Sequence, residues 1–253
     1  MEIFSLKNKT IFLSGSYRGL GFCIAEALGN AGAKVIINGR SSEGVACSVK
    51  KLKEKGIQAY GYAFDITKPD EISENIRQIL CENGPVDILV NNAGIQRRGA
   101  LESLPLNDWK ESMDLNLTAA FMLSQHFVKG MIERKKGKII NICSLMSSIT
   151  RPTTGAYTAS KGALLMLTKS MAVEWAKYNI QANAIAPGYF HTEMTDPLVK
   201  NEIFNKWITG RTPAGRWGKP EELGGIAVFL AGNASDFING QCIYVDGGLS
   251  SAI

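Results

Sequence analysis

The chain has 253 residues, 45% of them apolar, so one α/β domain spanning 1–253 could bury a large core. Its 28 basic and 23 acidic residues leave a formal net charge of +5, and the basic residues are scattered rather than gathered in one stripe. This mild charge argues against a nucleic-acid partner. No apolar run approaches the ~18 residues needed to span a bilayer, and the N-terminus does not read as a signal peptide. We therefore expect a cytoplasmic protein with no membrane partner.

The sequence offers little material for disulfide or metal chemistry. Its five cysteines are odd in number and include no Cys-x-x-Cys pair, and only two histidines are present. Neither a disulfide framework nor a metal site is predicted.

Short β-branched runs alternate with longer segments of helical period along the whole chain. The predicted strands are Thr10 to Leu13, Lys34 to Asn38, Gln58 to Ala63, Val86 to Val90, Lys138 to Ile142, Ile180 to Ile185 and Cys242 to Val245. The predicted helices are Leu20 to Ala31, Asp70 to Cys81, Asn107 to Arg134, Ala156 to Tyr178 and Glu221 to Ala231. This alternation predicts an α/β fold, a doubly wound (Rossmann) parallel sheet of about seven strands with helices on both faces.

The one long interruption of this alternation is the segment 187–220, where Gly, Pro and Thr separate short apolar pieces. It follows the carboxyl end of a predicted strand, the edge at which doubly wound sheets bind ligands, so we interpret it as a substrate lid. Trp207 and Trp217 fall within it, and anchoring the lid is favoured over stacking on a sugar.

A glycine-rich turn, Ser14 to Gly21, follows the first predicted strand and runs into a helix. Gly15, Gly19 and Gly21 allow positive φ and leave room for a pyrophosphate at the helix N-terminus. A tight structural turn would also need glycine. The position of the turn, directly after strand one of an alternating chain, favours a dinucleotide cofactor.

The second predicted strand ends in Asn38-Gly39-Arg40, without the acidic residue that NAD-selective folds place there for the ribose hydroxyls. Arg40 can offer a 2'-phosphate a bidentate contact, and Arg18 can add a second cation from the glycine turn. The alternative is that both arginines are solvated loop residues. We predict NADP(H) in preference to NAD(H).

Small and amide-bearing residues follow two further strands. Asn91-Asn92-Ala93-Gly94 ends the fourth strand and allows close approach of a cofactor, although a simple turn would read the same way. Asp65 ends the third strand, and with Ile66 it is placed beside the adenine. The carboxylate of Asp65 binds adenine or caps its own loop, and the sequence does not separate the two.

Ser144, Tyr157 and Lys161 carry the predicted chemistry. Residues four apart on a helix share a face, so Tyr157 and Lys161 should point together into the cleft. An ammonium ~5 Å from a phenol favours the phenolate by about 3 kcal/mol at an effective dielectric of ~20, which should lower the pKa of Tyr157 by roughly two units. Tyr157 then serves as acid and base, while Ser144 orients the substrate oxygen.

The order of these motifs resembles that of short-chain dehydrogenases/reductases over essentially the whole chain. Gly15, Gly19 and Gly21 match the family's Thr-Gly-x-x-x-Gly-x-Gly motif, with Ser14 in place of threonine, a change that keeps the hydroxyl. Asn91 to Gly94 match its Asn-Asn-Ala-Gly motif, and Ser144 precedes Tyr157 at the family's spacing.

The resemblance implies roles for further residues. Asn116 would hold a water in a proton relay from Lys161, and Lys161 would also bond the nicotinamide ribose. Pro187, Gly188 and Thr192 match a segment that contacts the nicotinamide amide. Asp246-Gly247-Gly248 resembles a signature near a tetramer interface, which implies a homotetramer. The cofactor-binding set is Gly15, Arg18, Gly19, Leu20, Gly21, Arg40, Asp65, Ile66, Asn92, Ala93, Gly94, Tyr157, Lys161, Pro187, Gly188 and Thr192.

Within the family, several stretches are similar to sugar-acid dehydrogenases, which implies reversible reduction of a keto group on a sugar acid. The stretches are Gly94 to Arg98, Ile140 to Ser144, Ala186 to Phe190 and Arg211 to Gly218. A sugar acid needs a cation for its carboxylate. Arg97, Arg98 and Arg151 border the cleft, and Arg97 or Arg98 is favoured; Ser144 and Tyr189 complete the predicted substrate set.

Other functions share parts of this pattern. A 3-oxoacyl carrier-protein reductase uses the same chemistry but needs an acyl channel and a basic docking face, and a sugar-acid dehydrogenase acting at another carbon would differ only in substrate contacts. An NADP(H)-sensing regulator could keep the fold without catalysis. The complete set of Asn116, Ser144, Tyr157 and Lys161 favours an enzyme.

Overall fold

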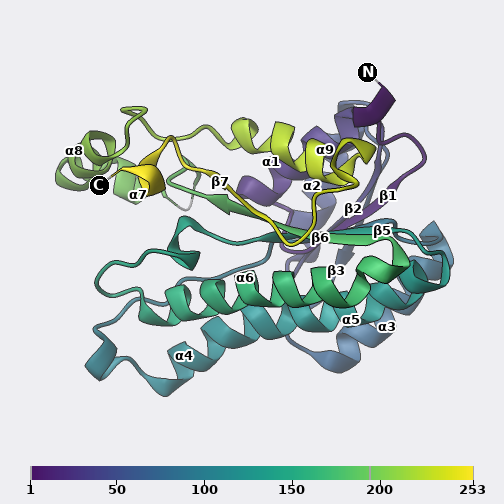
Figure 1. The fold of residues 1–253 in the computed structure, drawn as a ribbon, viewed down its shortest axis with the longest axis horizontal. Coiled ribbons are helices and arrows are strands. Elements are labelled where there is room, and N and C mark those ends of the chain that lie inside the picture. The colour runs from purple at the N-terminus through teal and green to yellow at the C-terminus, as the bar shows by residue number, and fades with distance from the viewer. Residues whose placement is uncertain (1, 194, 253) are drawn as a thin grey trace.

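A seven-stranded parallel sheet forms the centre of the protein (Figure 1). The computed structural model describes residues 2–193 and 195–252. The strands are β1 Thr10–Leu13, β2 Lys34–Gly39, β3 Ala59–Ala63, β4 Ile88–Asn91, β5 Gly137–Ile142, β6 Ile180–Pro187 and β7 Cys242–Val245. They lie in the order β3-β2-β1-β4-β5-β6-β7, with every neighbouring pair parallel. This order confirms the doubly wound sheet predicted from the sequence.

Helices cover both faces of the sheet. They are α1 Gly19–Asn30, α2 Ser42–Glu54, α3 Pro69–Asn83, α4 Leu106–Met113, α5 Ala119–Glu133, α6 Gly155–Trp175, α7 Asp196–Val199, α8 Glu202–Arg211 and α9 Gly224–Ala231. In Figure 1, α1, α2 and α9 lie above the sheet, while α3, α4, α5 and α6 lie below it. None of the helices in the described part of the chain is both long and apolar enough to cross a membrane.

The central strands are buried on both sides, which explains why they read as continuous apolar runs. Ile11 and Leu13 of β1 belong to the core shared with α1, α2 and α9. Phe12 points to the opposite face, where its ring lies 5.1 Å from that of Phe127 on α5. Alternate residues of one strand therefore hold both helical layers on the sheet.

The predicted helical stretch Asn107 to Arg134 is continuous in the structure, but it is not α-helical throughout. A π-helical turn, Asp114–Thr118, separates α4 from α5. Asn116 lies within this turn, where its Oδ1 accepts from the backbone N–H of Ile95 at 2.7 Å and its Nδ2 donates to the Ile95 carbonyl at 2.9 Å. Turns of this kind inside long helices often mark functional sites.

Two residues predicted at strand ends lie just beyond them. Asp65 is two residues past the end of β3, and Ser144 is two residues past the end of β5. Both strands stop earlier than their apolar runs, because the next residues turn into the loops at the carboxyl edge of the sheet. The side chains still lie at the predicted edge.

Candidate active site

One cavity of about 870 Å³ gathers the segments that follow the strand ends. The predicted site residues that line it are Gly15, Arg18, Gly19, Leu20, Gly21, Arg40, Asp65, Ile66, Asn92, Ala93, Gly94, Arg97, Arg98, Ser144, Arg151, Tyr157, Lys161, Pro187, Gly188, Tyr189 and Thr192. Asn116 does not line it and is buried directly behind Ile95. Residues from six strand ends are thus brought to one place, as the topology requires.

The glycine turn and the Asn-Asn-Ala-Gly segment interlock through Ser14. Its hydroxyl accepts from the backbone N–H groups of Asn92 at 3.1 Å and Ala93 at 3.2 Å. The Asn92 amide donates in return to the carbonyls of Ser14 and Gly15. Gly15 has φ +57°, and a Cβ on it would lie 2.8 Å from the Cα of Ala93. The expectation that serine serves as well as threonine here therefore has a structural basis, since only the hydroxyl is used.

We expect Ser14→Ala to lower the free energy of unfolding by about 1–3 kcal/mol, because two backbone donors would lose their acceptor. Ser14→Thr, which keeps the hydroxyl, should be close to neutral. Urea denaturation of the two variants checks this pair, and an alanine variant as stable as the threonine variant would contradict it.

The cradle formed by this turn fits a dinucleotide. Gly19, at the start of α1, has φ +59°, and the space beside its Cα holds no atom within 4 Å of an added Cβ. The first N–H groups of α1 have no partner within the helix, and they suit a pyrophosphate. Asn38 braces the turn, since its Oδ1 accepts from the Gly15 N–H at 3.3 Å while its Nδ2 donates to the carbonyls of Tyr62 and Phe64.

Asp65 has a structural partner of its own. Its Oδ1 accepts from the backbone N–H and the hydroxyl of Thr67, at 2.9 and 2.8 Å. The side chain thus caps its loop while it also borders the cavity. The sequence allows Asp65 either to bind adenine or to cap its own loop, and the structure shows the capping contacts directly.

Tyr157 and Lys161 share one face of α6, as their spacing predicts. The Lys161 Nζ lies 6.0 Å from the centre of the Tyr157 ring and donates to the Ile142 carbonyl at 2.6 Å. The Ser144 hydroxyl accepts from the Met146 N–H at 3.2 Å and hydrogen-bonds Tyr157. Proton donor, cation and orienting hydroxyl therefore converge beyond the end of β5.

The expected lowering of the Tyr157 pKa is wrong for the protein without cofactor. Burial raises the pKa of Tyr157 above its usual value, and the hydrogen bond from Ser144 offsets this only in part. Burial also lowers the pKa of Lys161 to about 8. Helical spacing alone indicates a cation beside a solvated phenol, whereas in the structure both groups are withdrawn from water and charge is disfavoured on each. At neutral pH Tyr157 is a phenol ready to donate a proton.

The three arginines that border the cavity differ in what they contact. Arg97 forms an ion pair with Glu111, with Nη2 and Oε2 2.7 Å apart. Arg98 has only long contacts to the Gln96 amide oxygen, at 3.4 and 3.5 Å. Arg151 stacks its guanidinium on an aromatic ring of α8, and its buried Nε and Nη2 have no hydrogen-bond partner among the described residues.

The preference for Arg97 or Arg98 as carboxylate ligand stays a prediction, and the ion pair with Glu111 makes Arg97 the less available of the two. Glu111 already neutralises it, a contact between a loop and a helix that the sequence does not reveal. Burial and the nearby Arg151 both lower the pKa of Arg98, which shows that these two guanidinium groups repel each other. Two cations share one region of the cavity without an ion pair among the described residues.

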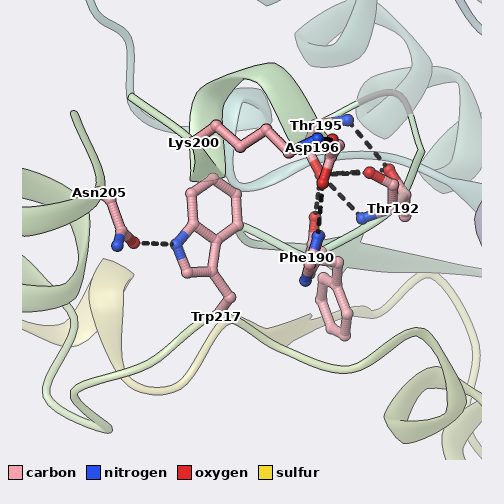
Figure 2. A network of polar contacts seen from close by, with 8 residues as sticks. Phe190, Thr192, Thr195, Asp196, Lys200, Asn205 and Trp217 are labelled. Atoms are coloured by element: carbon pink, nitrogen blue, oxygen red, sulfur yellow. Dashed lines mark hydrogen bonds and ion pairs between the residues drawn. The ribbon is translucent and has the colours of Figure 1, made fainter. Parts of the chain in front are cut away.

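The predicted lid segment folds onto itself beside the cavity (Figure 2). The Thr195 hydroxyl donates to the Phe190 carbonyl at 2.7 Å and accepts from the Thr192 N–H at 2.8 Å. The Trp217 Nε1 donates to the Asn205 amide oxygen at 2.7 Å, and its ring meets Tyr189 edge-on. Trp217 thus ties the end of the segment to α8, which supports anchoring rather than sugar stacking.

The fold and the cavity define a class, the nucleotide-dependent oxidoreductases of doubly wound architecture. Residues 15–250 match a family model described as enoyl-(acyl carrier protein) reductase. The 5-keto-D-gluconate 5-reductase of Escherichia coli K12 is 49% identical, over 100% of this chain and 99% of its own. The 2-dehydro-3-deoxy-D-gluconate 5-dehydrogenase of Formosa agariphila is 48% identical, over 100% and 97%.

A solved structure agrees with these relatives. The gluconate 5-dehydrogenase of Burkholderia cenocepacia J2315, in complex with NADP and tartrate, superposes with a TM-score of 0.97 at 46% identity, covering 100% of this chain and 99% of that one. The chain belongs to the short-chain dehydrogenase/reductase family. It is an NAD(P)-dependent oxidoreductase that acts on CH–OH groups.

Tyr17 is among the cavity residues that the sequence does not single out. Tyr17 lies in the glycine turn and lines the cavity, and its ring covers Gly39 at the end of β2. The only signal available was an aromatic residue between the motif glycines, which carries no meaning until the turn is placed against the second strand.

Proposed function

We propose that the protein is an NADP(H)-preferring oxidoreductase that interconverts a keto and a hydroxyl group on a sugar acid, 5-keto-D-gluconate and D-gluconate being the favoured pair. The observation that carries the proposal is the pair of guanidinium groups, Arg98 and Arg151, in the cavity that also holds Tyr157. Arg151 has two buried nitrogen atoms with no hydrogen-bond partner among the described residues, and the more exposed Arg98 adds a second cation beside it. A bound carboxylate would give these donors a partner. The names of the relatives, all sugar-acid enzymes, support the same substrate class.

The proposed mechanism divides the work among four residues. The cradle at the start of α1 would hold a nicotinamide cofactor, which would supply the hydride for reduction and accept it in the reverse direction. During reduction, the Tyr157 hydroxyl gives its proton to the carbonyl oxygen as that oxygen becomes an alcohol. Ser144 holds the same oxygen in line with Tyr157. The Lys161 ammonium stabilises the phenolate left on Tyr157, and Asn116 positions the backbone of Ile95, which lines the same cavity.

The proposed preference for NADP(H) rests on the end of β2. No acidic residue stands at 38–40, and the exposed Arg18 and Arg40 both line the cavity. A guanidinium binds a 2'-phosphate through paired N–H donors, whereas an acidic side chain would repel it.

We also propose a homotetramer in the cytoplasm, with residues 1–253 as one domain and 187–220 as its lid. Large apolar side chains are exposed on α5 and α6, including Phe121 and Val173, which is 81% exposed. Such a surface favours burial against a second copy. All five cysteines are free, as is usual in a reducing compartment.

The rate of reduction should fall as Lys161 loses its charge. Because the pKa of Lys161 is lowered to about 8 while that of Tyr157 is raised, Tyr157 stays protonated through the window in which Lys161 is neutralised. The value of kcat/KM for keto-acid reduction, which reports the free enzyme, should be flat below about pH 8 and fall above it. A profile from about pH 6 to about pH 10 that stays flat, or rises, would contradict this assignment.

The competing assignment is a carrier-protein reductase acting on an acyl thioester. Within the described part of the chain, neither Arg98 nor Arg151 has an ion-pair partner, and two such cations in the cavity make a poor channel for an acyl chain. Oxidation of NADPH by the purified protein should be fast with 5-keto-D-gluconate and slow with a 3-oxoacyl thioester. The reverse order would overturn the sugar-acid assignment and leave the family membership intact.

A further inference from the structure

The ring of Tyr17 fills the space beside the end of β2. A Cβ placed on Gly39 would lie 2.2 Å from Cδ1 of this ring, and a Cβ on Gly44 of α2 would lie 2.8 Å from its Cδ2. The ring is therefore held between two residues that lack side chains. An acidic side chain at position 39 has no room while Tyr17 stays in place.

Contacts on both sides fix Tyr17 in this position. The Ser48 hydroxyl donates to the Tyr17 carbonyl at 2.6 Å, which ties the glycine turn to α2. The N-terminus of α2 is itself capped, because the Ser41 hydroxyl accepts from the Gly44 N–H at 3.1 Å. The Arg18 guanidinium carbon lies 5.2 Å from the centre of the Tyr17 ring, within the range of a cation–π contact.

We propose that Tyr17 is a positioning residue that sets the cofactor preference; this inference rests on the proposed preference for NADP(H). Its ring occupies the space in which NAD-selective folds place a carboxylate after the second strand. The same ring holds the exposed Arg18 side chain at the cavity, where a 2'-phosphate can bind it. An arginine ordered in advance loses less conformational freedom on binding.

The first test compares binding rather than turnover. Titrations of the full chain with NADPH, NADH, 2',5'-ADP and 5'-AMP are run on wild type, Tyr17→Ala and Tyr17→Phe. Tyr17→Ala should weaken the binding of NADPH and 2',5'-ADP by about 3- to 30-fold, the range that a cation–π contact contributes. The affinities for NADH and 5'-AMP should be nearly unchanged. Tyr17→Phe, which keeps the ring, should keep the wild-type ratio.

A matched control is available on the far side of the molecule. The Lys177 Nζ lies 5.1 Å from the Tyr178 ring centre, so Tyr178→Ala also removes an aromatic ring with an adjacent cation, outside the residues that line the cavity. It should leave the NADPH to NADH affinity ratio unchanged. Thermal unfolding of each variant identifies any that fail to fold, and Tyr17→Leu then replaces Tyr17→Ala, because leucine keeps apolar bulk without an aromatic face.

The second test uses Gly39→Asp in two backgrounds. In wild type the new side chain collides with the Tyr17 ring, so NADPH binding should fall without a gain for NADH. In the Tyr17→Ala background the carboxylate has room, and NADH should bind more tightly than it does to Tyr17→Ala alone. Equal effects of Gly39→Asp in both backgrounds would overturn the proposal.

The results separate the two proposals. Wild type that binds NADPH no more tightly than NADH would remove the proposed cofactor preference, and the role of Tyr17 with it. If wild type prefers NADPH and Tyr17→Ala has the same ratio of NADPH to NADH affinity, the proposed role of Tyr17 is overturned while the proposed cofactor preference stands. Equal losses of affinity for NADPH and NADH in Tyr17→Ala would show that Tyr17 has only a structural role, and they would also overturn the proposal.

Discussion

Tyr157→Phe should lower kcat for keto-acid reduction by about 10²- to 10⁴-fold, the range that general-acid catalysis contributes. The substitution removes one oxygen, while the remaining ring keeps its packing beside Leu145 and Met146. Binding of NADPH should therefore be nearly unchanged. Steady-state turnover and an NADPH titration on the same sample measure the two effects separately.

Tyr189→Phe is the matched control, because Tyr189 is the other tyrosine of the cavity whose pKa is raised by burial. Its hydroxyl has no place in the proposed proton transfer, so this variant should keep most of the turnover. If the loss followed Tyr189→Phe and spared Tyr157→Phe, the proton donor would have been assigned to the wrong residue.

Arg151→Met should lower kcat/KM for 5-keto-D-gluconate by about 30- to 150-fold, equivalent to about 2–3 kcal/mol for hydrogen bonds to a charged group. Methionine keeps apolar contact with Tyr189 and Phe204 while it removes the charge. Because the lost cation has two unpartnered buried nitrogen atoms among the described residues, the free energy of unfolding should not decrease. Steady-state kinetics and thermal unfolding together check this expectation.

Two controls sharpen the Arg151 experiment. Arg97→Met removes a cavity arginine that is already neutralised by Glu111, so its effect on kcat/KM should be small. The methyl ester of the keto acid carries no charge, and Arg151→Met should affect its reduction far less than that of the acid. Equal losses for acid and ester would show that Arg151 does not bind the carboxylate.

Much of the fold could be predicted from the sequence because a parallel sheet leaves a strong pattern. Its strands are buried on both faces and therefore appear in the sequence as apolar runs. The helices between them are recognised by the helical spacing of their apolar residues. The bounds predicted for β7, for example, are the ones that the structure has, Cys242–Val245. The ends of strands then bring Ser144 and the glycine turn to one edge without further information.

Other features depend on contacts that no local pattern encodes. The π turn holds Asn116, whose amide bonds Ile95 on a separate loop. The pairing of Arg97 with Glu111, and the lack of any such partner for Arg151 among the described residues, become visible only when the loops are placed. The pKa values of Tyr157 and Lys161 likewise follow from burial, whereas spacing alone suggested only their mutual attraction.

The central claim, that Tyr157, Arg98 and Arg151 serve the reduction of a sugar acid, is tested most directly by identifying a product. Purified protein is incubated with D-gluconate and NADP⁺, and the carbon oxidised is located by NMR. We predict a keto group at C5 and accompanying formation of NADPH. Absence of any oxidised sugar acid, together with rapid reduction of an acyl thioester, would contradict the account.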